Sequence, residues 1–477
     1  MQKTILTPDI CVIGAGSAGL TVAAAAAAFG VEVVLIEKDK MGGDCLNYGC
    51  VPSKALIAAG KAAQAHRNSA KYGVKANEPS IDFAAANAHV RNVIAAIEPH
   101  DSVERFEGLG VNVIQSAARF VDAETVQAGH YLIKARRFVV ATGSSAFVPP
   151  IAGLNEVRYL TNETLFDQTN RPDHLLIIGG GPIGMEMAQA HQRLGSKVTV
   201  IEASKALSNS DPEFAAIVIE RLRAEGVEIR EGANVEKVEK SESGVRLTLK
   251  QANGTIDYVD GTHLLVAAGR SANITNLGLD EAGIKTHSKG IEVDKGLRTS
   301  NKKVYAIGDV IGGLQFTHLA GAHASLLVRT LLFRMPVNHH KLVIPFVTYT
   351  EPELAHIGMT EQEARQVYGD GLKVLTADFS GNDRALAEGK TVGKVKLIVG
   401  KGGRLVGADI VGPQAGELLA PLALMISKKM HVKALLDLML PYPTLTEVLK
   451  RAALSYYAGA AENPWVRRLL AFLRKFG

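Results

Sequence analysis

The sequence predicts an α/β protein of two or three domains. Two observations point to parallel sheets with crossover helices: a strand–glycine–helix–strand unit near the N-terminus, and a second copy of that unit beginning at His174. A third observation is a strand-rich stretch that begins after Pro345. The chain has 477 residues, of which 47% are hydrophobic, and this exceeds what one core usually supports.

The first unit opens with an apolar strand over residues 9–13 and continues into an alanine-rich helix that reaches Phe29. Its turn carries three glycines in a G-x-G-x-x-G pattern: Gly14, Gly16 and Gly19. A second apolar strand, residues 31–37, ends in Glu37, about 20 residues past the glycines. The glycines let the backbone approach a pyrophosphate, and the acid accepts hydrogen bonds from a ribose. The unit is therefore predicted to be a Rossmann-type dinucleotide site.

The second unit repeats this arrangement, with strands at 175–178 and 198–202. Its glycines are Gly179, Gly181 and Gly184. Glu202 ends the second strand, where a carboxylate suits the free 2′-hydroxyl of NADH and repels the 2′-phosphate of NADPH. We therefore expect NADH rather than NADPH. Two nearby cations, Arg193 and Lys205, are expected to be solvated surface groups.

Three cysteines in so long a chain cannot form a structural disulfide framework. Cys11 lies in an apolar strand and is expected to be a buried, inert thiol. Residues five apart in a regular helix lie roughly 8 to 9 Å apart, beyond the roughly 7 Å limit for a disulfide, so Cys45 and Cys50 need a bent segment to pair. Four neighbours favour such a bend: Gly42, Gly43, Asn47 and Gly49. Pro52 suits the first turn of a following helix, whose N-terminus would favour the Cys50 thiolate. A redox pair is thus favoured, and a metal site is not, because no Cys or His partners occur at zinc-site spacing.

Composition excludes several other functions. The net charge of +5 is small for this length and no basic stripe is interleaved with aromatic residues, which argues against nucleic-acid binding. The apolar run at residues 20–29 is too short to span a bilayer, and no basic, cleavable signal peptide is evident. We expect a cytoplasmic protein.

The run from Gly42 to Lys54 resembles the active-site signature of the class I pyridine nucleotide-disulfide oxidoreductases, a group that includes mercuric reductase, dihydrolipoamide dehydrogenase and glutathione reductase. The resemblance covers residues 5 to about 460. It extends through residues 141–143, the Gly179 fingerprint, and residues 267–270, 305–309 and 442–447.

This resemblance implies a homodimeric enzyme that uses FAD and a nicotinamide dinucleotide. Cys45 would exchange with substrate, and Cys50 would be the charge-transfer thiol beside the flavin. Lys54 would lie near flavin N5 and pair with Glu186, while Asp309 would bind the FAD ribityl chain. The other positions that the resemblance places at the cofactors are Gly43, Thr142, Gly143, Gly269, Arg270 and Gly308.

The family's domain order, placed on this chain, gives a split FAD-binding domain at 1–149 and 271–342. An NAD-binding domain occupies 150–270, and an α+β dimerisation domain occupies 343–460. The remaining residues, 461–477, form a tail. The dimer is expected to share its active site across the interface.

One departure limits the prediction of the acceptor. Most disulfide-reducing members carry a histidine, supported by a glutamate matching Glu447, at the position occupied here by Tyr442. Tyrosine titrates about 3.5 units higher than histidine and is a poorer proton source for a leaving thiolate. Tyrosine at this position resembles mercuric reductase, but the C-terminal cysteine pair of those enzymes has no counterpart here. The acceptor is thus a disulfide, a metal ion or another small molecule. The alternatives are a dihydrolipoamide dehydrogenase variant, or a flavin redox sensor without sustained turnover.

The tail contains a short amphipathic helix that Pro464 would begin. Its apolar stripe is Trp465, Leu469, Phe472, Leu473 and Phe476, and its cations are Arg467, Arg468, Arg474 and Lys475. Such a helix lies in a membrane interface or packs against the dimer's own surface. Packing is favoured from the sequence, because most amphipathic helices cover a core.

Overall fold

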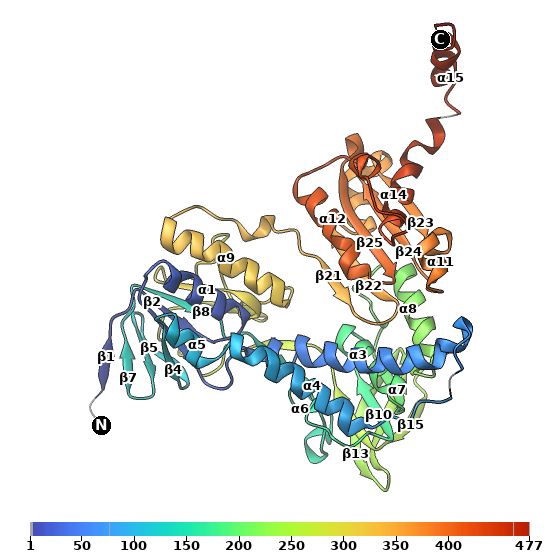
Figure 1. The fold of residues 1–477 in the computed structure, drawn as a ribbon. Helices are drawn as coiled ribbons and strands as arrows, with labels where there is room; N and C mark the ends of the chain where they lie inside the picture. Colours follow the sequence, from blue (N-terminus) through green and yellow to red (C-terminus); the bar gives the residue numbers. More distant parts are fainter. Residues whose placement is uncertain (1–2, 76, 461, 477) are drawn as a thin grey trace. The chain divides into compact units, whose positions relative to one another are not determined.

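The computed structural model describes residues 3–75, 77–460 and 462–476, so the predicted ends of the tail, 461 and 477, lie outside the described residues (Figure 1). The chain divides into two compact units. Unit 1 is Met1–Ser204 with Gly226–Leu342, and unit 2 is Lys205–Glu225 with Val343–Gly477. Unit 1 ends where the sequence placed the start of the dimerisation domain, whereas one segment of the predicted NAD domain is grouped with unit 2.

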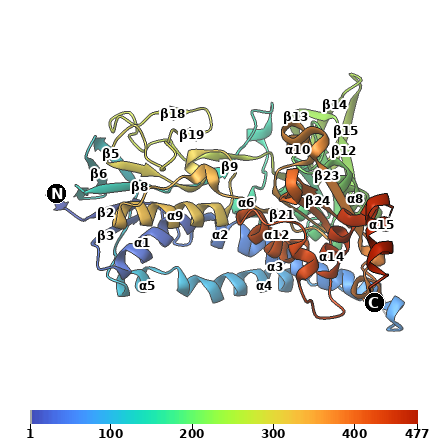
Figure 2. The same ribbon diagram turned by 90° about the horizontal axis from the view of Figure 1, so that it is seen from above.

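The first dinucleotide module of unit 1 is built on a five-stranded parallel sheet. Its strand order is β20 (Val304–Ala306), β8 (Arg137–Val140), β2 (Ile10–Ile13), β3 (Val33–Glu37) and β4 (Asn112–Gln115). Helices α1 (Ser17–Ala28) and α9 (Thr317–Phe333) lie side by side on one face (Figures 1 and 2). A smaller sheet covers the other face with strands β1 (Thr4–Leu6), β7 (Tyr131–Ile133), β6 (Thr125–Ala128) and β5 (Ala118–Asp122). Because both faces are covered, the central strands are almost wholly apolar, and Cys11 is buried as expected.

The second module of unit 1 repeats the design. Its parallel sheet runs β12 (Glu228–Glu231), β11 (Lys197–Glu202), β10 (His174–Ile178) and β16 (His263–Val266). An antiparallel sheet packs on it through apolar side chains, with strands β13 (Ala233–Ser241), β14 (Gly244–Gln251) and β15 (Ile256–Gly261). Helix α7 (Pro182–Arg193) follows the glycine turn, as the sequence predicted.

Three helices carry the cysteine segment and join the two modules: α2 (Gly43–Asn47), α3 (Cys50–Arg67) and α4 (Phe83–Ile97). Helix α3 packs against α4 and α7 (Figure 1). A side chain at Gly60 would lie 3.3 Å from the Ala190 Cα atom, so the backbones of α3 and α7 approach closely. The expectation of a solvated Arg193 is wrong, because this packing buries its side chain and Arg67 donates to its carbonyl at 2.7 Å. Lys205 is exposed as expected.

Unit 2 centres on a five-stranded antiparallel sheet, which the strand-rich stretch after Pro345 predicted. The strand order is β21 (Phe346–Thr348), β22 (Glu353–Gly358), β25 (Leu405–Gly412), β24 (Lys394–Val399) and β23 (Lys373–Asp378). Helices α12 (Ala415–Ser427) and α14 (Glu447–Leu454) cover one face through apolar contacts. Helix α8 (Pro212–Ala224) packs against β22 and β25.

The shorter elements complete the two units. Unit 1 also contains α5 (Val103–Gly108), α6 (Asn162–Leu165), β9 (Ser144–Ala146), β17 (Arg270–Ala272), β18 (Thr286–His287) and β19 (Gly290–Ile291). Unit 2 also contains α10 (Glu361–Tyr368), α11 (Asp383–Ala387), α13 (Ala434–Asp437) and α15 (Pro464–Leu473). Among the described residues no helix is both long enough and apolar enough to cross a bilayer.

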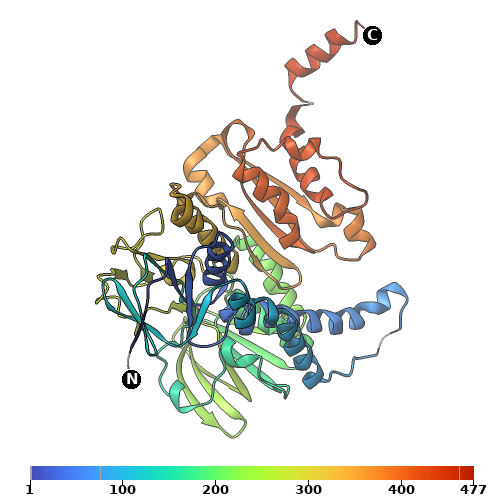
Figure 3. The same cartoon turned by 60° about the vertical axis from the view of Figure 1, so that its left-hand side comes forward.

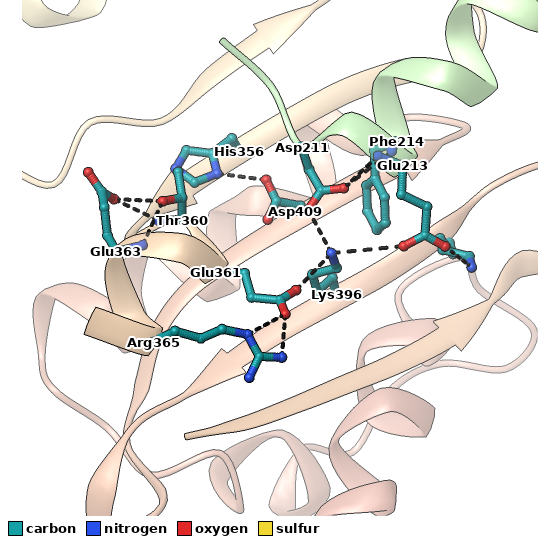
Figure 4. A network of polar contacts seen from close by, with 11 residues as sticks. Asp211, Glu213, Phe214, His356, Thr360, Glu361, Glu363, Arg365, Lys396 and Asp409 are labelled. Atoms are coloured by element: carbon teal, nitrogen blue, oxygen red, sulfur yellow. Dashed lines mark hydrogen bonds and ion pairs between the residues drawn. The ribbon is translucent and has the colours of Figure 1, made fainter. Parts of the chain in front are cut away.

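The sheet face toward α8 carries buried charges (Figure 4). Lys396 Nζ lies 2.6 Å from an Asp211 carboxylate oxygen and 3.0 Å from a Glu361 oxygen. Burial opposes the charge, yet the hydrogen bonds to both acids hold the pKa of Lys396 above its ordinary value. Beside it, the buried His356 donates from Nδ1 to Asp409 at 2.7 Å. Because these acids and bases are paired, α8 is fixed against the sheet at a specific position.

We expect Lys396→Met to destabilise this face by about 3 kcal/mol, because Asp211 would remain largely buried without its cation, whereas Glu361 would keep its ion pair with Arg365. Hydrogen exchange of β24 and β25 amides should then accelerate on the order of a hundredfold. Lys394→Met is the matched control on the same strand, since its partner Glu213 is largely exposed and the pair contributes about 1 kcal/mol or less. Equal acceleration in the two variants would contradict the importance of the buried network.

Candidate active site

The two glycine turns have the same local geometry. A Cβ atom at Gly14 would lie 2.4 Å from the Ala141 carbonyl oxygen, and one at Gly179 would lie 2.4 Å from the Ala267 oxygen. The third glycines, Gly19 and Gly184, are pressed equally closely against their own turns.

The middle glycine of each turn lies in a different environment from the other two. A Cβ atom at Gly181 would have no neighbour within 4 Å among the described residues, and one at Gly16 would meet only the Gly43 Cα atom, at 4.0 Å. Each turn is thus closed toward the protein and open at the position where a pyrophosphate approaches the backbone. The residues present therefore fit a dinucleotide in both modules.

The carboxylates that end the second strands are held in matching positions. Glu37 accepts hydrogen bonds from the Ala15 amide at 2.6 Å and from the Asp39 amide at 2.9 Å. Glu202 accepts from the Gly180 amide at 2.7 Å and from the Ser204 amide at 2.9 Å. Each acid is fixed at the rim of its glycine turn, where a ribose would lie.

The cysteine segment is bent as its glycines predicted. Cys45 lies in α2, the chain breaks its helical path at Tyr48 and Gly49, and Cys50 is the first residue of α3. Gly43 takes a left-handed φ of 59°, and a Cβ there would lie 2.8 Å from the Gly16 Cα atom. The cysteine segment is thereby set against the first glycine turn. Both cysteines are free thiols in this structure, which is the reduced form of the pair.

The two thiols have opposite acidities. The hydrogen bond from Cys45 lowers the pKa of Cys50 to about 6, with further lowering by the Thr317 hydroxyl and the Lys54 charge against the opposing effect of burial. The same interaction raises the pKa of Cys45, and burial adds to that rise. Thr317 Oγ1 lies 3.3 Å from the Cys50 sulfur. Cys50 at the start of α3 is therefore a thiolate at neutral pH, and Cys45 is its protonated neighbour.

Lys54 and Glu186 form the predicted ion pair. Lys54 Nζ lies 2.8 Å from a Glu186 oxygen, and the Glu186 side chain is only 6% exposed. Lys54 comes from α3 and Glu186 from α7, so the pair joins the cysteine helix to the second module. It lies one helical turn beyond Cys50.

A second polar network gathers several residues that the resemblance placed at the cofactors. The Ser144 hydroxyl donates to Asp309 at 2.6 Å and accepts from Arg270 Nε at 2.8 Å. Arg270 also pairs with Asp44 at 3.1 Å. Burial raises the pKa of Asp309, against the opposing effects of Ser144 and Arg270.

The remaining predicted cofactor residues lie around this network. The Thr142 hydroxyl donates to the Asn273 carbonyl at 2.8 Å, which ties the strand end to the returning chain. Gly143 and Gly269 have left-handed φ values of 68° and 118°, and no atom of the described residues lies within 4 Å of a Cβ at either. Gly308 lies against the Ala320 methyl group.

Tyr442 and Glu447 lie in unit 2. The Tyr442 hydroxyl donates to Asp383 at 2.8 Å, and its side chain is 72% exposed. Asp383 raises the pKa of the Tyr442 phenol. Glu447, expected to support this position, accepts a hydrogen bond from the Thr444 amide at 3.3 Å, and its charge adds to the rise in the pKa of Tyr442.

Sequence reasoning missed four site residues, namely Asp44, Ser144, Thr317 and Asp383. Asp44 stands inside the cysteine signature, where its position one residue before Cys45 could have marked it. Ser144 directly follows the 141–143 motif, whose extension by one residue could have marked it. Thr317 and Asp383 contact the site from distant parts of the chain, and no local pattern marks them.

Comparison with known proteins agrees with this geometry. Residues 8–324 match the family model described as pyridine nucleotide-disulphide oxidoreductase, and residues 344–453 match its dimerisation domain. A mercuric reductase from Streptomyces lividans is 33% identical over 462 residues, covering 95% of this chain and 97% of that protein. A dihydrolipoyl dehydrogenase from Geobacillus stearothermophilus is 36% identical over 457 residues, covering 93% of this chain and 95% of that protein.

Solved structures show the same fold. The HOCl-induced flavoprotein disulfide reductase RclA from Escherichia coli superposes with a TM-score of 0.85 at 28% identity, covering 93% of this chain and 99% of that chain. Its Cu(II) complex gives a TM-score of 0.83 at 28% identity, covering 93% of this chain and 98% of that one.

Two dinucleotide modules around a reactive thiol pair define a flavoprotein that exchanges electrons with nicotinamide. The chain belongs to the pyridine nucleotide-disulphide oxidoreductases. Enzymes of this family depend on FAD and a pyridine nucleotide, and the dimerisation-domain match indicates a homodimer.

The thiol acidities predict a pH profile. In the reduced holoenzyme, the long-wavelength absorbance band from the Cys50 thiolate to the flavin should titrate with a midpoint near the pKa of about 6, so the band is lost only as the pH falls through that value. Cys45→Ala removes the hydrogen bond and should move the midpoint upward. Cys11→Ser is the control and should leave the profile unchanged, because Cys11 is fully buried. A wild-type midpoint at the ordinary value of 9.0 would sink this assignment.

Proposed function

We propose that this enzyme passes electrons from NADH through FAD to the Cys45–Cys50 pair and from there to a soft metal ion such as Hg²⁺ or Cu²⁺. The observation that carries the proposal is the phenol of Tyr442, bound to Asp383, at the position where the resemblance places a proton-donating histidine in disulfide-reducing relatives. Thiolates are ligands that soft ions prefer.

The electrons balance without another redox reactant. NADH oxidation releases two electrons and one proton, and these convert the Cys45–Cys50 disulfide to a Cys45 thiol and a Cys50 thiolate. The dithiol then returns two electrons to one mercuric ion or to two cupric ions. The disulfide forms again and the Cys45 proton goes to solvent.

In this proposal the two cysteines have separate tasks. Cys45 receives the incoming ion, and Cys50 is the thiolate that contacts the flavin. The low pKa of Cys50 keeps it in the thiolate form, which donates electrons. Cys45 loses its proton when the ion binds, because metal ligation requires the thiolate.

Other residues would hold and orient the cofactors. The bound FAD would supply the two-electron chemistry. In the first module, Gly14, Gly16 and Glu37 would receive its pyrophosphate and ribose, and Asp309 its ribityl chain. Lys54, fixed by Glu186, would place positive charge near the flavin.

Tyrosine at position 442 suits metal reduction better than disulfide reduction. A disulfide substrate needs a proton for each leaving thiolate, and a donor works best with a pKa near the working pH. Asp383 raises the pKa of Tyr442 above its already high ordinary value. The phenol therefore keeps its proton at neutral pH, whereas reduction of a metal ion consumes none.

The comparisons support this acceptor class. Several relatives at 32–35% identity are named mercuric reductase, and a structural neighbour is a Cu(II) complex. We also propose a cytoplasmic location, and an active site shared across the homodimer in which Tyr442 of one protomer serves the thiols of the other.

The fixed position of Glu202 leads us to expect a higher kcat/KM with NADH than with NADPH. Glu202→Ala should lower the ratio of kcat/KM with NADH to kcat/KM with NADPH by roughly tenfold. The substitution removes both the repulsion of a 2′-phosphate and the acceptor for the ribose hydroxyl. Steady-state kinetics with both nucleotides provide the measurement. Glu236→Ala is a matched control that removes one exposed acid elsewhere in the module and should not change the ratio. A wild-type preference for NADPH would overturn the nucleotide assignment.

The acceptor is tested with holoenzyme, NADH and a panel of lipoamide, glutathione disulfide, mercuric ions, cupric ions and quinones. We expect turnover with the metal ions and little with the disulfides. Tyr442→His should raise disulfide reduction by roughly a hundredfold, the usual contribution of a positioned general acid. Tyr442→Phe is the control that keeps the ring without adding a proton donor.

Each outcome of the panel decides between named functions. Efficient wild-type reduction of lipoamide would establish a dihydrolipoamide dehydrogenase variant. Failure of every acceptor in FAD-loaded protein would favour a redox sensor. Both results would overturn the proposed metal reductase.

A further inference from the structure

The C-terminal helix α15 (Pro464–Leu473) and the turn that follows it, residues 474–476, separate apolar from charged side chains completely. Successive residues in a helix are rotated by roughly 100°. On that spacing, one arc of roughly 160° contains only apolar residues, namely Trp465, Val466, Leu469, Leu470, Phe472, Leu473 and Phe476. The opposite arc contains all four cations with Pro464 and Ala471 between them. The Asn463 side chain caps the helix at the Trp465 amide, and the rings of Phe472 and Phe476 meet edge to face on the apolar side, 4.9 Å between centroids.

This apolar face is not packed within its own chain. None of the described residues of α15 is buried, and the side chains of Trp465, Leu469, Leu470, Phe472, Leu473 and Phe476 are each between 49% and 76% exposed. Figures 1 and 3 show α15 standing off from the sheet and helices of its unit. Among the described residues of one chain, no burial of this face supports the packing alternative that the sequence favoured.

The charges and position of α15 identify what covers its apolar face. Residues 463–476 contain Arg467, Arg468, Arg474 and Lys475 and no acid. A nucleic acid would bind the cations but leave the apolar arc in water. A second copy of this chain would already be joined through the dimerisation domain, whose family match ends at residue 453, before α15 begins.

We propose that α15 binds an anionic lipid surface, with its apolar arc in the acyl boundary and its four cations at the headgroups. Trp465 sits at the start of the helix beneath the Arg468 guanidinium, 5.6 Å from its ring, and both groups suit the interface. The homodimer carries two such helices. The contact does not depend on which acceptor the enzyme reduces.

The chain offers a direct reporter, because Trp465 is its only tryptophan. Holoenzyme is titrated with vesicles of phosphatidylcholine alone and of phosphatidylcholine mixed with phosphatidylglycerol, and tryptophan emission and acrylamide quenching are followed. The mixed vesicles should shift the emission to shorter wavelength and protect Trp465 from quenching. Neutral vesicles should do so weakly, and high salt should reverse the effect.

Variants separate the two faces of the helix. Arg467→Gln with Arg468→Gln should weaken binding to the mixed vesicles roughly tenfold or more. The matched control, Lys285→Gln with Lys289→Gln, removes two exposed cations from unit 1 and should bind as wild type does. Leu469→Asn with Leu473→Asn should abolish the emission shift, with FAD absorbance and turnover showing that the variant is folded.

Three results would overturn the proposal. The first is a Trp465 emission that is already blue-shifted and protected from quenching without lipid and does not respond to vesicles, together with loss of the dimer when the chain is ended after Glu462. This result would mean that α15 packs against a second copy of the chain. The second is an emission change with DNA but not with vesicles. The third is equal binding to mixed vesicles by full-length and shortened chains.

Discussion

The ion pair between Lys54 and Glu186 constrains the rest of the site. Glu186 is almost fully buried, and a buried carboxylate without a cation costs several kcal/mol. The pair therefore fixes the register of α3 against α7, where Gly60 allows the two backbones to meet. Because Cys50 begins α3 one turn before Lys54, the same contact sets the position of the thiolate and lowers its pKa through the Lys54 charge.

The two modules hold an acid beside a phosphate site in the same way. A carboxylate beside a phosphate site would repel the ligand unless its position were controlled, and here Glu37 and Glu202 each accept two backbone amides. These hydrogen bonds hold each acid where the ribose would lie. The open space at the middle glycine would leave the pyrophosphate a separate position beside the backbone. In the proposed preference for NADH, the rigid acceptor at Glu202 would suit the ribose hydroxyl groups and disfavour an added phosphate.

Local chemistry was predictable from the sequence and distant packing was not. The glycine turns, the strand ends at Glu37 and Glu202 and the bend before Cys50 all follow from short-range backbone rules, and the strand-rich unit follows from the strand-forming stretch after Pro345. Arg193 at a helix end looked like a solvated cation, but α3 buries it. Thr317 and Asp383 touch Cys50 and Tyr442 across long sequence separations, so no spacing could reveal them. The Lys54–Glu186 pair was found only because a family signature linked the two positions.

Proton supply connects these features. With Cys50 already a thiolate at neutral pH, only Cys45 carries a proton that substrate binding must remove, and in the proposed reaction the metal ion would displace it on ligation. A disulfide acceptor reverses this requirement, because each leaving thiolate takes up a proton. Tyr442 stands at the family's proton-donor position. Asp383 accepts the hydrogen bond of the Tyr442 hydroxyl and raises the pKa of that phenol. Tyr442 is therefore a poor acid, and this favours an acceptor whose reduction needs no proton. The substitution of tyrosine for histidine and the acidity split of the cysteines therefore favour the same class of substrate.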